Sequence, residues 1–365
     1  MSYLERIDEE LAEIRRANRY REVATHQLAG AIDFSSNDYL GLSSHPQVVQ
    51  ALKNASRAGS GGARLLGGRH REHSLLEEEL ASWLGRERAL LFSSGYHAAI
   101  GTIPVLARST GSILSDERNH ASLIDGIRLA RAPRTIYPHG NPPSHEGRQS
   151  ALLVSESIFS MDGDTVHPRD LLRTLGPGDV LFIDAAHALG VVGPQGAGLD
   201  YELDDPRVIV MGTLSKAFGA HGGFVAGPAR AIDLLANTAR TFIFDTALPP
   251  AIALAARIAL TLIRRADDGR ASLRANVDRV REGLRALGLP TIETASPIVP
   301  VVVGEELQTL ELSRRLLERG VYAPAIRPPT VPPGGSRLRL SIRSDHTPTQ
   351  IDVLLRELKA CLVTS

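Results

Sequence analysis

The feature that most constrains the fold is a regular alternation of short apolar runs and helical patterns between residues 88 and 211. The apolar runs are at residues 89–92, 112–115, 151–154, 180–183 and 208–211. Between them lie helical segments, clearest at residues 96–107 and 121–130. Apolar, β-branched runs without polar alternation are typical of strands buried on both faces. The alternation therefore predicts an α/β fold with a mostly parallel sheet covered by helices.

The pattern changes on both sides of this region. Residues 1–36 begin with an amphipathic helix and end with a possible short strand near residues 31–35. After the prolines at 249 and 250, helices dominate and strands are few, which favours a smaller α+β domain. We therefore expect an N-terminal segment over residues 1–36, a large domain over 37–262 and a small C-terminal domain over 263–365.

Composition excludes several classes of protein. The 365 residues include 41 basic and 41 acidic side chains, so the chain lacks the positive surplus of a nucleic-acid or membrane-surface binder. A single cysteine, Cys361, permits no intrachain disulfide and favours the cytoplasm. No apolar run reaches the roughly 18 residues of a membrane span, and the charged N-terminus is not a secretory signal. His70 and His73 have no evident third ligand, so no metal site is expected.

Lysine is almost absent from the chain. Only Lys53, Lys216 and Lys359 occur, and the other 38 basic residues are arginine. Arginine cannot act as a nucleophilic amine, whereas lysine can. Lys53 and Lys359 fall on the polar faces of predicted helices, but Lys216 directly follows a predicted strand in the segment GTLSK. Lys216 is therefore the lysine most suited to a chemical role.

Polar segments follow four of the predicted strands, where an α/β sheet places its ligand crevice. They are SSGYH at 93–97, SESIFSMDG at 155–163, DAAH at 184–187 and GTLSK at 212–216. The first opens a helix whose free N–H groups can bind an anion. Asp184, His187 and Lys216 add a carboxylate, an imidazole and an amine. This set suits pyridoxal phosphate, which needs a phosphate cradle, a carboxylate at its ring nitrogen and a lysine for its aldehyde. No phosphate-loop, dinucleotide, nucleophile-elbow or zinc-protease motif competes with it.

The chain also resembles the α-oxoamine synthase family of fold-type I pyridoxal phosphate enzymes, almost from end to end. The matching blocks, in order, are FSSNDYLGLSSHP at 34–46, SGGARLLGGRHREHSLLEEELASWLG at 60–85, LFSSGYHAA at 91–99, DERNHASLIDGIRL at 116–129, ESIFSMDGD at 156–164, DAAHALGVVGPQGAG at 184–198, GTLSKAFGAHGG at 212–223 and RPPTVPPGGSRLRLS at 327–341. Two positions depart from the family pattern: His221, and Asp245 where serine is more usual.

The resemblance implies roles at the cofactor. Lys216 would bind the aldehyde and act as a base, Asp184 would pair with the ring nitrogen, and His187 would contact the ring oxygen. His120 would stack on the ring, although its place before a helix also suits a helix cap. The phosphate would be held by backbone and hydroxyl groups of Gly95, Tyr96, Ser160, Thr213 and Ser215, with Thr246 supplied by the partner subunit of a homodimer.

Further residues are implied at the substrates. Arg339 would bind the carboxylate of the amino acid, a task suited to a bidentate guanidinium. Arg21, with Arg19 as the competing choice, would contact the acyl substrate. Arg327 and Thr330 would lie beside the substrate channel, with His120 facing it, and Asn37 and Glu156 would shape the pocket.

Within the family, the IRPPTVP loop and the compact length favour the acyltransferase of biotin biosynthesis. Its reaction is the decarboxylative condensation of L-alanine with pimeloyl-CoA or pimeloyl-acyl carrier protein. The main alternative is glycine C-acetyltransferase (2-amino-3-ketobutyrate CoA ligase) or another α-oxoamine synthase, such as 5-aminolevulinate synthase or serine palmitoyltransferase. A more remote alternative is a non-catalytic subunit on the same fold, although such subunits characteristically lose the lysine that is present here as Lys216.

Overall fold

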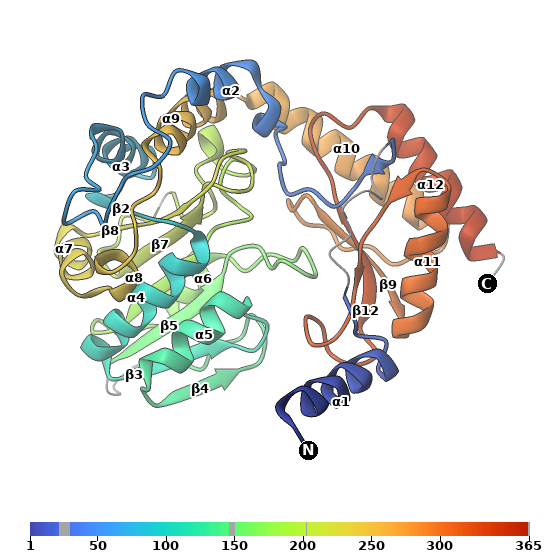
Figure 1. Ribbon diagram of the computed structural model, residues 1–365, viewed down its shortest axis with the longest axis horizontal. Coiled ribbons are helices and arrows are strands. Elements are labelled where there is room, and N and C mark those ends of the chain that lie inside the picture. The colour runs from blue at the N-terminus through green and yellow to red at the C-terminus, as the bar shows by residue number, and fades with distance from the viewer. Residues whose placement is uncertain (22–29, 146–149, 202, 364–365) are drawn as a thin grey trace. The chain divides into compact units, whose positions relative to one another are not determined.

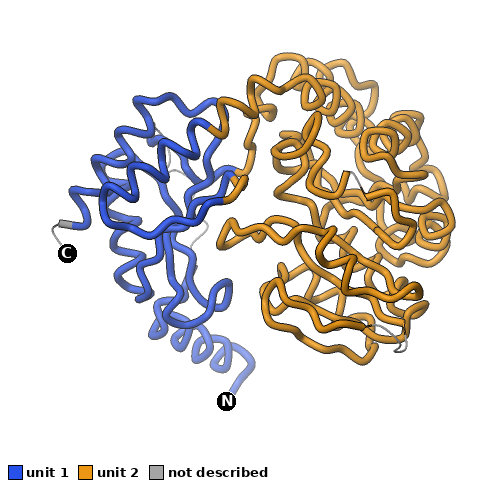
Figure 2. Tube along the Cα trace, turned by 180° about the vertical axis from the view of Figure 1, so that it is seen from behind, with its two compact units in different colours: residues 1–36, 275–293, 297–365 blue, residues 37–274, 294–296 orange. Residues whose placement is uncertain are grey.

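The computed structural model describes residues 1–21, 30–145, 150–201 and 203–363. The chain forms two compact units, which are coloured separately in Figure 2. The large unit comprises residues 37–274 and 294–296, and the small unit comprises residues 1–36, 275–293 and 297–365. The chain passes from the large unit to the small one within helix α10 (Asp267–Ala286).

The large unit is built on a mostly parallel sheet, as the strand–helix alternation predicts. Within the described residues this is a seven-stranded sheet with the order β2-β8-β7-β6-β5-β3-β4 (Figure 1). Strands β3 to β7 run parallel to one another, and β8 is antiparallel to both β2 and β7. The bounds are β2 Arg88–Phe92, β3 Ser112–Asp116, β4 Arg134–Tyr137, β5 Ala151–Glu156, β6 Val180–Asp184, β7 Val208–Thr213 and β8 Gly223–Gly227. The predicted fold class is confirmed.

Helices cover this sheet because each buries one apolar face. The helix α4 (Gly95–Thr110) packs on β5, β7 and β8 and on the neighbouring helix α5 (Ala121–Ala130). Its residues Ala98 and Ile103 are fully buried, as are Leu152 and Phe182 from the strands beneath. The other helices of this unit are η1 Leu42–Ser44, α2 Pro46–Lys53, α3 Arg71–Trp83, α6 Pro168–Arg173, η2 Pro194–Gly196, α7 Ala229–Thr238, α8 Arg240–Ile243 and α9 Pro250–Arg264.

The small unit combines short sheets with helices. Its main sheet has the order β11-β12-β9, with both pairs antiparallel, from β11 Ala325–Ile326, β12 Ser336–Ser341 and β9 Ile298–Gly304. A second, parallel pair joins β1 (Ile32–Asp33) to β10 (Val321–Tyr322). The helices are α1 Tyr3–Arg16, α11 Glu306–Glu318 and α12 Pro348–Val363. Across the described ranges, no helix combines the length and apolar character needed to cross a membrane.

The strand order brings polar strand ends together. Strands β3, β5, β6 and β7 are consecutive neighbours and parallel, so their carboxyl ends meet at one edge of the sheet. These ends carry Asp116, Glu156, Asp184 and Thr213. Glu156 and Asp184 are direct partners in the register of β5 and β6. The candidate site is therefore at this edge.

A buried ion pair joins Arg86, which lies between α3 and β2, to Asp200, which follows η2. Arg86 donates to the carbonyl of Leu203 at 2.6 Å and lies 3.5 Å from the Asp200 carboxylate. Their side chains are only 5% and 1% exposed. Burial raises the pKa of Asp200 to about 6, although Arg86 opposes this effect.

We expect Arg86→Met to lower the free energy of unfolding by about 3 kcal/mol, because it leaves a buried carboxyl without its partner. The control is Arg88→Gln, which removes the exposed pair of Arg88 with Asp233 and is expected to cost less than about 1 kcal/mol. Urea denaturation of both variants makes the measurement. Equal losses would show that burial of the Arg86 pair has no special effect.

Candidate active site

Lys216 lies in a tight loop after β7 and is half-buried. Backbone bonds close this loop, from Leu214 N to Gly222 O at 2.9 Å and from Gly219 N to Lys216 O at 2.8 Å. Gly219 has φ +62°, and a Cβ there would lie 2.1 Å from the backbone nitrogen of Ser43. Glycine is therefore required at 219, and the close approach fixes the loop that carries Lys216.

A chain of hydrogen bonds leads from Lys216 into the protein. Its Nζ lies 3.0 Å from His187 Nε2, and His187 Nδ1 lies 2.7 Å from the Tyr39 hydroxyl. The hydroxyl donates to Asn37 Oδ1 at 3.0 Å, so it accepts from His187 Nδ1. The neutral imidazole that satisfies both contacts carries its hydrogen on Nδ1 and accepts at Nε2 from the Lys216 amine. This arrangement gives Lys216 a neutral acceptor for a hydrogen bond.

Two buried carboxyl groups lie at the ends of β5 and β6. Asp184 is 5% exposed and accepts from the backbone nitrogen of Ala186 at 2.8 Å. Burial raises the pKa of Asp184, and the charges of Lys216 and His120 oppose this rise. Burial also raises the pKa of Glu156 well above its ordinary value, and the neighbouring Asp184 adds to the effect. A cationic partner for Asp184 would lower the cost of keeping it ionised.

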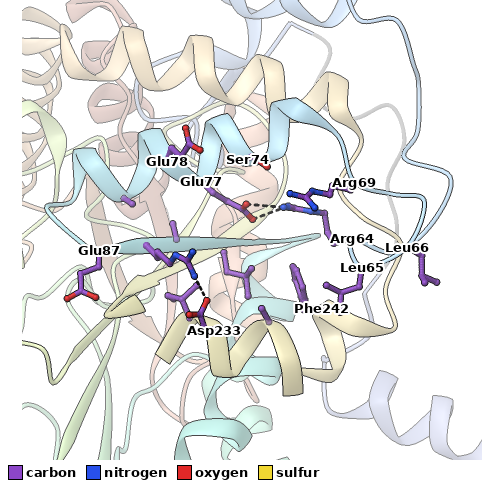
Figure 3. A pocket seen from close by; sticks show the side chains of 16 residues that line it. Arg64, Leu65, Leu66, Arg69, Ser74, Glu77, Glu78, Glu87, Asp233 and Phe242 are labelled. Carbon is purple, nitrogen blue, oxygen red and sulfur yellow. Dashed lines mark hydrogen bonds and ion pairs between the residues drawn. The ribbon is translucent and has the colours of Figure 1, made fainter. Parts of the chain in front are cut away.

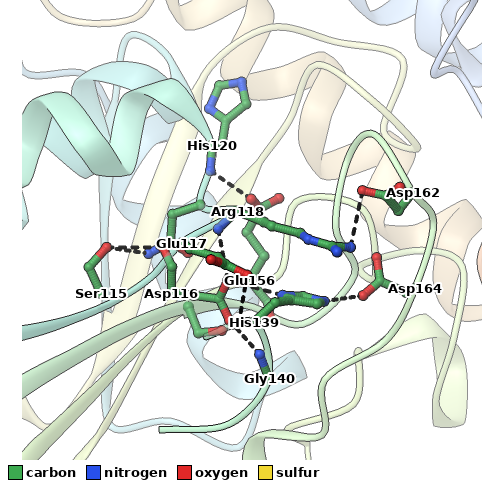
Figure 4. Close-up of polar contacts among 12 residues, drawn as sticks. Ser115, Asp116, Glu117, Arg118, His120, His139, Gly140, Glu156, Asp162 and Asp164 are labelled. Atoms are coloured by element: carbon green, nitrogen blue, oxygen red, sulfur yellow. Dashed lines mark hydrogen bonds and ion pairs between the residues drawn. The ribbon is translucent and has the colours of Figure 1, made fainter. Parts of the chain in front are cut away.

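His120 is the N-cap of α5 (Figure 4). Its Nδ1 accepts from the backbone nitrogen of Ser122 at 3.2 Å and lies 2.8 Å from the Ser122 hydroxyl. Its own backbone nitrogen donates to Glu156 Oε1 at 2.7 Å. The surrounding protein lowers the pKa of His120 by desolvation, although the residue is exposed to solvent. The capping role is thus shown, and the stacking role stays a prediction.

The start of α4 faces the hydroxyl groups at the end of β7. A Cβ on Gly95 would lie 3.3 Å from the Thr213 Cβ, so the helix start and the strand end are in close contact. Thr213 Oγ1 lies 2.7 Å from Ser215 Oγ. The helix N-terminus supplies free N–H groups at Gly95 and Tyr96, and the hydroxyls add further donors. The structure brings four of the predicted phosphate ligands together here.

The other two predicted phosphate ligands lie on separate segments. Ser160 is buried in the turn between Ile158 and Thr165, which follows β5. Thr246 is exposed and follows α8. Its neighbour Asp245, the departure from the family pattern, bonds to the Ser93 hydroxyl and lies 3.2 Å from His97 Nδ1. Asp245 therefore contacts the segment immediately before α4.

Of the predicted substrate residues, Asn37 and His120 lie in the large unit, and the arginines and Thr330 lie in the small unit. Arg339 is buried in β12 and donates to the Ser341 hydroxyl at 2.7 Å. Arg19 forms an ion pair with Glu306 at 3.0 Å, whereas Arg21 donates to the carbonyls of Arg19 and Pro328, each at 3.4 Å. Arg327 is buried, bonds to the carbonyl of Asn18, and has an Nε without a partner in the described part of the chain. The exposed Thr330 follows, with its nitrogen donating to Arg327 O at 3.1 Å.

Sequence reasoning gave no role to Tyr39 or to the pair of Ser93 and His97. Tyr39 lies within the block FSSNDYLGLSSHP, but nothing local indicates that its hydroxyl reaches His187, which is 148 positions away. The one feature of the sequence that could have drawn attention to Tyr39 is the scarcity of aromatic residues, since the chain has only seven tyrosines. A buried tyrosine usually has a polar partner, and here that partner is in the site.

We expect Gly219→Ala to lower the free energy of unfolding by about 3 kcal/mol and to weaken binding of pyridoxal phosphate, because the new Cβ collides with the backbone near Ser43. Gly85→Ala is the matched control, with φ +61° and nothing within 4 Å of its Cβ. Gly85→Ala should lower the free energy of unfolding only by the ~1–2 kcal/mol that a left-handed backbone conformation costs alanine. It should leave cofactor affinity unchanged. Thermal denaturation and cofactor titration test both. Similar losses of stability and of cofactor affinity in the two variants would contradict the conclusion that the close approach of Ser43 requires glycine at 219.

Comparisons with known proteins show the family of this chain. The family model described as "Aminotransferase class I and II" matches residues 29–358. The 8-amino-7-oxononanoate synthase of Anaeromyxobacter sp. (strain K) is 44% identical over 91% of this chain and 86% of its own length. The solved 8-amino-7-oxononanoate synthase of Francisella tularensis has a TM-score of 0.80 and 29% identity, covering 92% of this chain and 99% of its own.

A high-resolution structure of SPT with a PLP internal aldimine has a TM-score of 0.90 and 27% identity, with 100% of this chain and 99% of the other covered. The resemblance drawn from the sequence blocks is confirmed. The chain belongs to the aminotransferase class I and II family and, within it, to the group of the 8-amino-7-oxononanoate synthases.

Proposed function

We propose that this chain is a pyridoxal phosphate-dependent acyltransferase that condenses L-alanine with a pimeloyl thioester. The products are 8-amino-7-oxononanoate, CO2 and the free thiol carrier, and the reaction is a step of biotin biosynthesis. The observation that carries the proposal is the Lys216–His187 contact beside the buried Asp184, in a chain 44% identical to named 8-amino-7-oxononanoate synthases. We place the enzyme in the cytoplasm, in keeping with its single cysteine.

The residues present fit pyridoxal phosphate. Lys216 would hold its aldehyde and Asp184 its ring nitrogen, since a buried carboxyl with a raised pKa is stabilised by a cationic N–H. The start of α4, with the hydroxyls of Thr213 and Ser215, would hold the phosphate. His120, His187 and Ser160 would complete the set. When bound, the cofactor supplies an aldehyde that takes up amines and a ring that withdraws electrons from the amino-acid Cα.

The chain's own residues then position the reactants and move protons. The Lys216 amine takes the proton from the Cα of alanine and returns one later. His187 Nε2, at 3.0 Å, accepts a hydrogen bond from that amine and keeps it oriented. Tyr39 and Asn37 hold His187 in the tautomer that can accept, because the hydroxyl receives the Nδ1 hydrogen.

Arginines of the small unit would bind the substrate carboxylates. Arg339 would bind the carboxylate of alanine through its planar guanidinium. Arg21 is better supported than Arg19 as the contact to the acyl substrate, because Arg19 is already paired with Glu306. Within the described residues Arg21 pairs with no carboxylate, so its charge is available for an acidic group. Arg327 and Thr330 would line the same region.

The active enzyme is proposed to be a homodimer in which Thr246 reaches the phosphate of the partner subunit. Three large apolar side chains lie exposed on the two segments nearest Thr246: Leu65 at 56%, Leu66 at 77% and Phe244 at 70%. The bond from Ala247 N to Gly62 O at 2.9 Å joins these segments into one surface. A cavity of about 670 Å³ opens beside them, where Arg64 is bonded to Glu77 (Figure 3). Exposed apolar groups of this size suit a subunit contact.

We expect Lys216→Ala to lower the rate of 8-amino-7-oxononanoate formation by at least about a thousandfold, because no other amine can replace the nucleophile and base. Lys53→Ala and Lys359→Ala are the matched controls and should keep the wild-type rate. Each protein is assayed with alanine and pimeloyl-CoA or pimeloyl-acyl carrier protein, and in parallel with glycine and acetyl-CoA and with serine and palmitoyl-CoA. Full activity of Lys216→Ala, or a preference for glycine or serine, would refute the proposal.

The subunit contact is tested separately with Leu66→Asp, which adds a charge to the exposed apolar surface. We expect a monomer by analytical ultracentrifugation and an affinity for pyridoxal phosphate about tenfold weaker, since the phosphate site of one subunit no longer receives Thr246 from its partner. Leu307→Asp, on the exposed face of α11, is the control and should remain a dimer. A Leu66→Asp dimer with normal cofactor affinity would contradict the proposed interface.

A further inference from the structure

His139 is held between two carboxylates from different parts of the large unit. Its Nδ1 lies 3.0 Å from Asp116 Oδ1, and its Nε2 bonds to Asp164 Oδ2 (Figure 4). Its ring meets the ring of Phe159 edge-on, with 4.4 Å between centroids. Asp116 is 1% exposed and also accepts from the backbone nitrogens of Arg118 and Gly140, at 2.9 and 2.8 Å.

The geometry determines the protonation of His139. A carboxylate oxygen can only accept a hydrogen bond, and His139 faces one with each ring nitrogen. Either neutral tautomer would set a nitrogen lone pair against an oxygen lone pair. The imidazolium alone satisfies both contacts, and each bond is then charge-assisted.

The two carboxylates belong to segments that carry proposed cofactor contacts. Asp116 ends β3 and begins the turn that leads to His120. Asp164 closes the turn that carries Ser160, where the Phe159 nitrogen donates to Asp164 O at 3.0 Å. A weaker link joins the same segments nearer the surface, the ion pair of Arg118 with Asp162 at 3.5 Å. His139 is thus a half-buried connection between the His120 turn and the Ser160 turn.

We propose that protonated His139 is a positioning residue, which fixes the His120 turn and the Ser160 turn relative to each other so that both side chains meet the cofactor in one geometry. The proposal rests on the proposed function for the roles of His120 and Ser160. It adds a residue that touches neither cofactor nor substrate and acts through two others. A misplacement of about 1 Å in such contacts can cost roughly a hundredfold in rate.

The charge on His139 should persist through neutral pH. Burial by itself lowers the pKa of His139, but its bonds to Asp116 and Asp164 outweigh burial and raise the pKa to about 9. Because this pKa lies above the unfolded value of about 6.5, the stabilisation is fully present below pH ~6.5 and is lost as the pH rises through about 9. The charged or titratable groups around the ring are Asp116, Glu117, Arg118, Tyr137, Asp162 and Asp164.

The first test is His139→Gln, which cannot donate to both carboxylates as an imidazolium does. We expect a dissociation constant for pyridoxal phosphate about tenfold higher at pH 7.5, a value typical of one lost charge-assisted bond, and loss of the transition near pH 9 in the affinity profile. The control, Arg118→Gln, breaks the exposed link between the same segments and should change affinity less than about twofold. A variant with a lower melting temperature but unchanged affinity and pH profile would overturn the proposal.

Asp164→Asn gives an independent test, which decides the matter if His139→Gln does not fold. The amide of asparagine can donate to Nε2, so a neutral imidazole then satisfies both contacts. We expect the alkaline transition in cofactor affinity near pH 9 to disappear, because the neutral ring still holds both turns. A transition that remains near pH 9 would refute the role of the imidazolium.

Nitrogen-15 NMR of histidine-labelled protein reads the protonation of His139 without using activity, with the signal assigned by its absence from His139→Gln. A charged ring at pH 7.5 is expected in the wild type, and a neutral ring would overturn the proposal. If the enzyme instead shows this charged ring and yet no condensation of alanine, the proposed function fails while the inference about His139 stands on its own geometry.

Discussion

Three acidic side chains are buried at the ends of neighbouring strands in the large unit. Asp116, Glu156 and Asp184 are each 5% exposed or less, and an unpaired buried charge is expensive. Each therefore has donors aimed at it: Asp116 receives His139 and two backbone N–H groups, and Glu156 receives the nitrogen of His120. Asp184 has the backbone nitrogen of Ala186 and the nearby charge of Lys216. The turns of the site follow from meeting these demands.

The buried carboxyl groups also divide the histidines of this region into those that favour the charged form and those that favour the neutral form. His139 faces carboxylates on both sides, and its bonds raise its pKa to about 9. His120 lies near both Asp184 and Lys216, and desolvation lowers its pKa. His187 accepts from one neighbour and donates to another, which requires the neutral ring. One site thus combines a ring whose partners favour the charged form with rings whose surroundings favour the neutral form, and the difference arises from which hydrogen-bond partners the strand ends supply.

Much of this could be predicted from sequence, and the missing parts have physical causes. Strands such as Ala151–Glu156 and Val208–Thr213 are buried throughout, and their continuous apolar runs predicted strands buried on both faces. Strands β4, Arg134–Tyr137, and β8, Gly223–Gly227, were not predicted, and glycine of the kind found at both ends of β8 is depleted in strands. Lys216 and Asp184 were predicted from strand-end chemistry, but the contacts of Tyr39 with His187 and of His139 with Asp164 join residues far apart, and local patterns carry no information on such pairs.

The arginine-rich composition makes the position of Lys216 more informative. Two buried arginines in this chain donate to backbone carbonyl groups: Arg86 to Leu203, and Arg270 to Ile263 at 2.7 Å. A guanidinium supplies five such donors in a fixed plane and never loses its charge, so it suits structural burial better than an ammonium. The amine of Lys216, bonded to a neutral imidazole at 3.0 Å, is in the opposite situation. Its environment suits the proposed role of an amine that releases a proton, a task that arginine cannot perform.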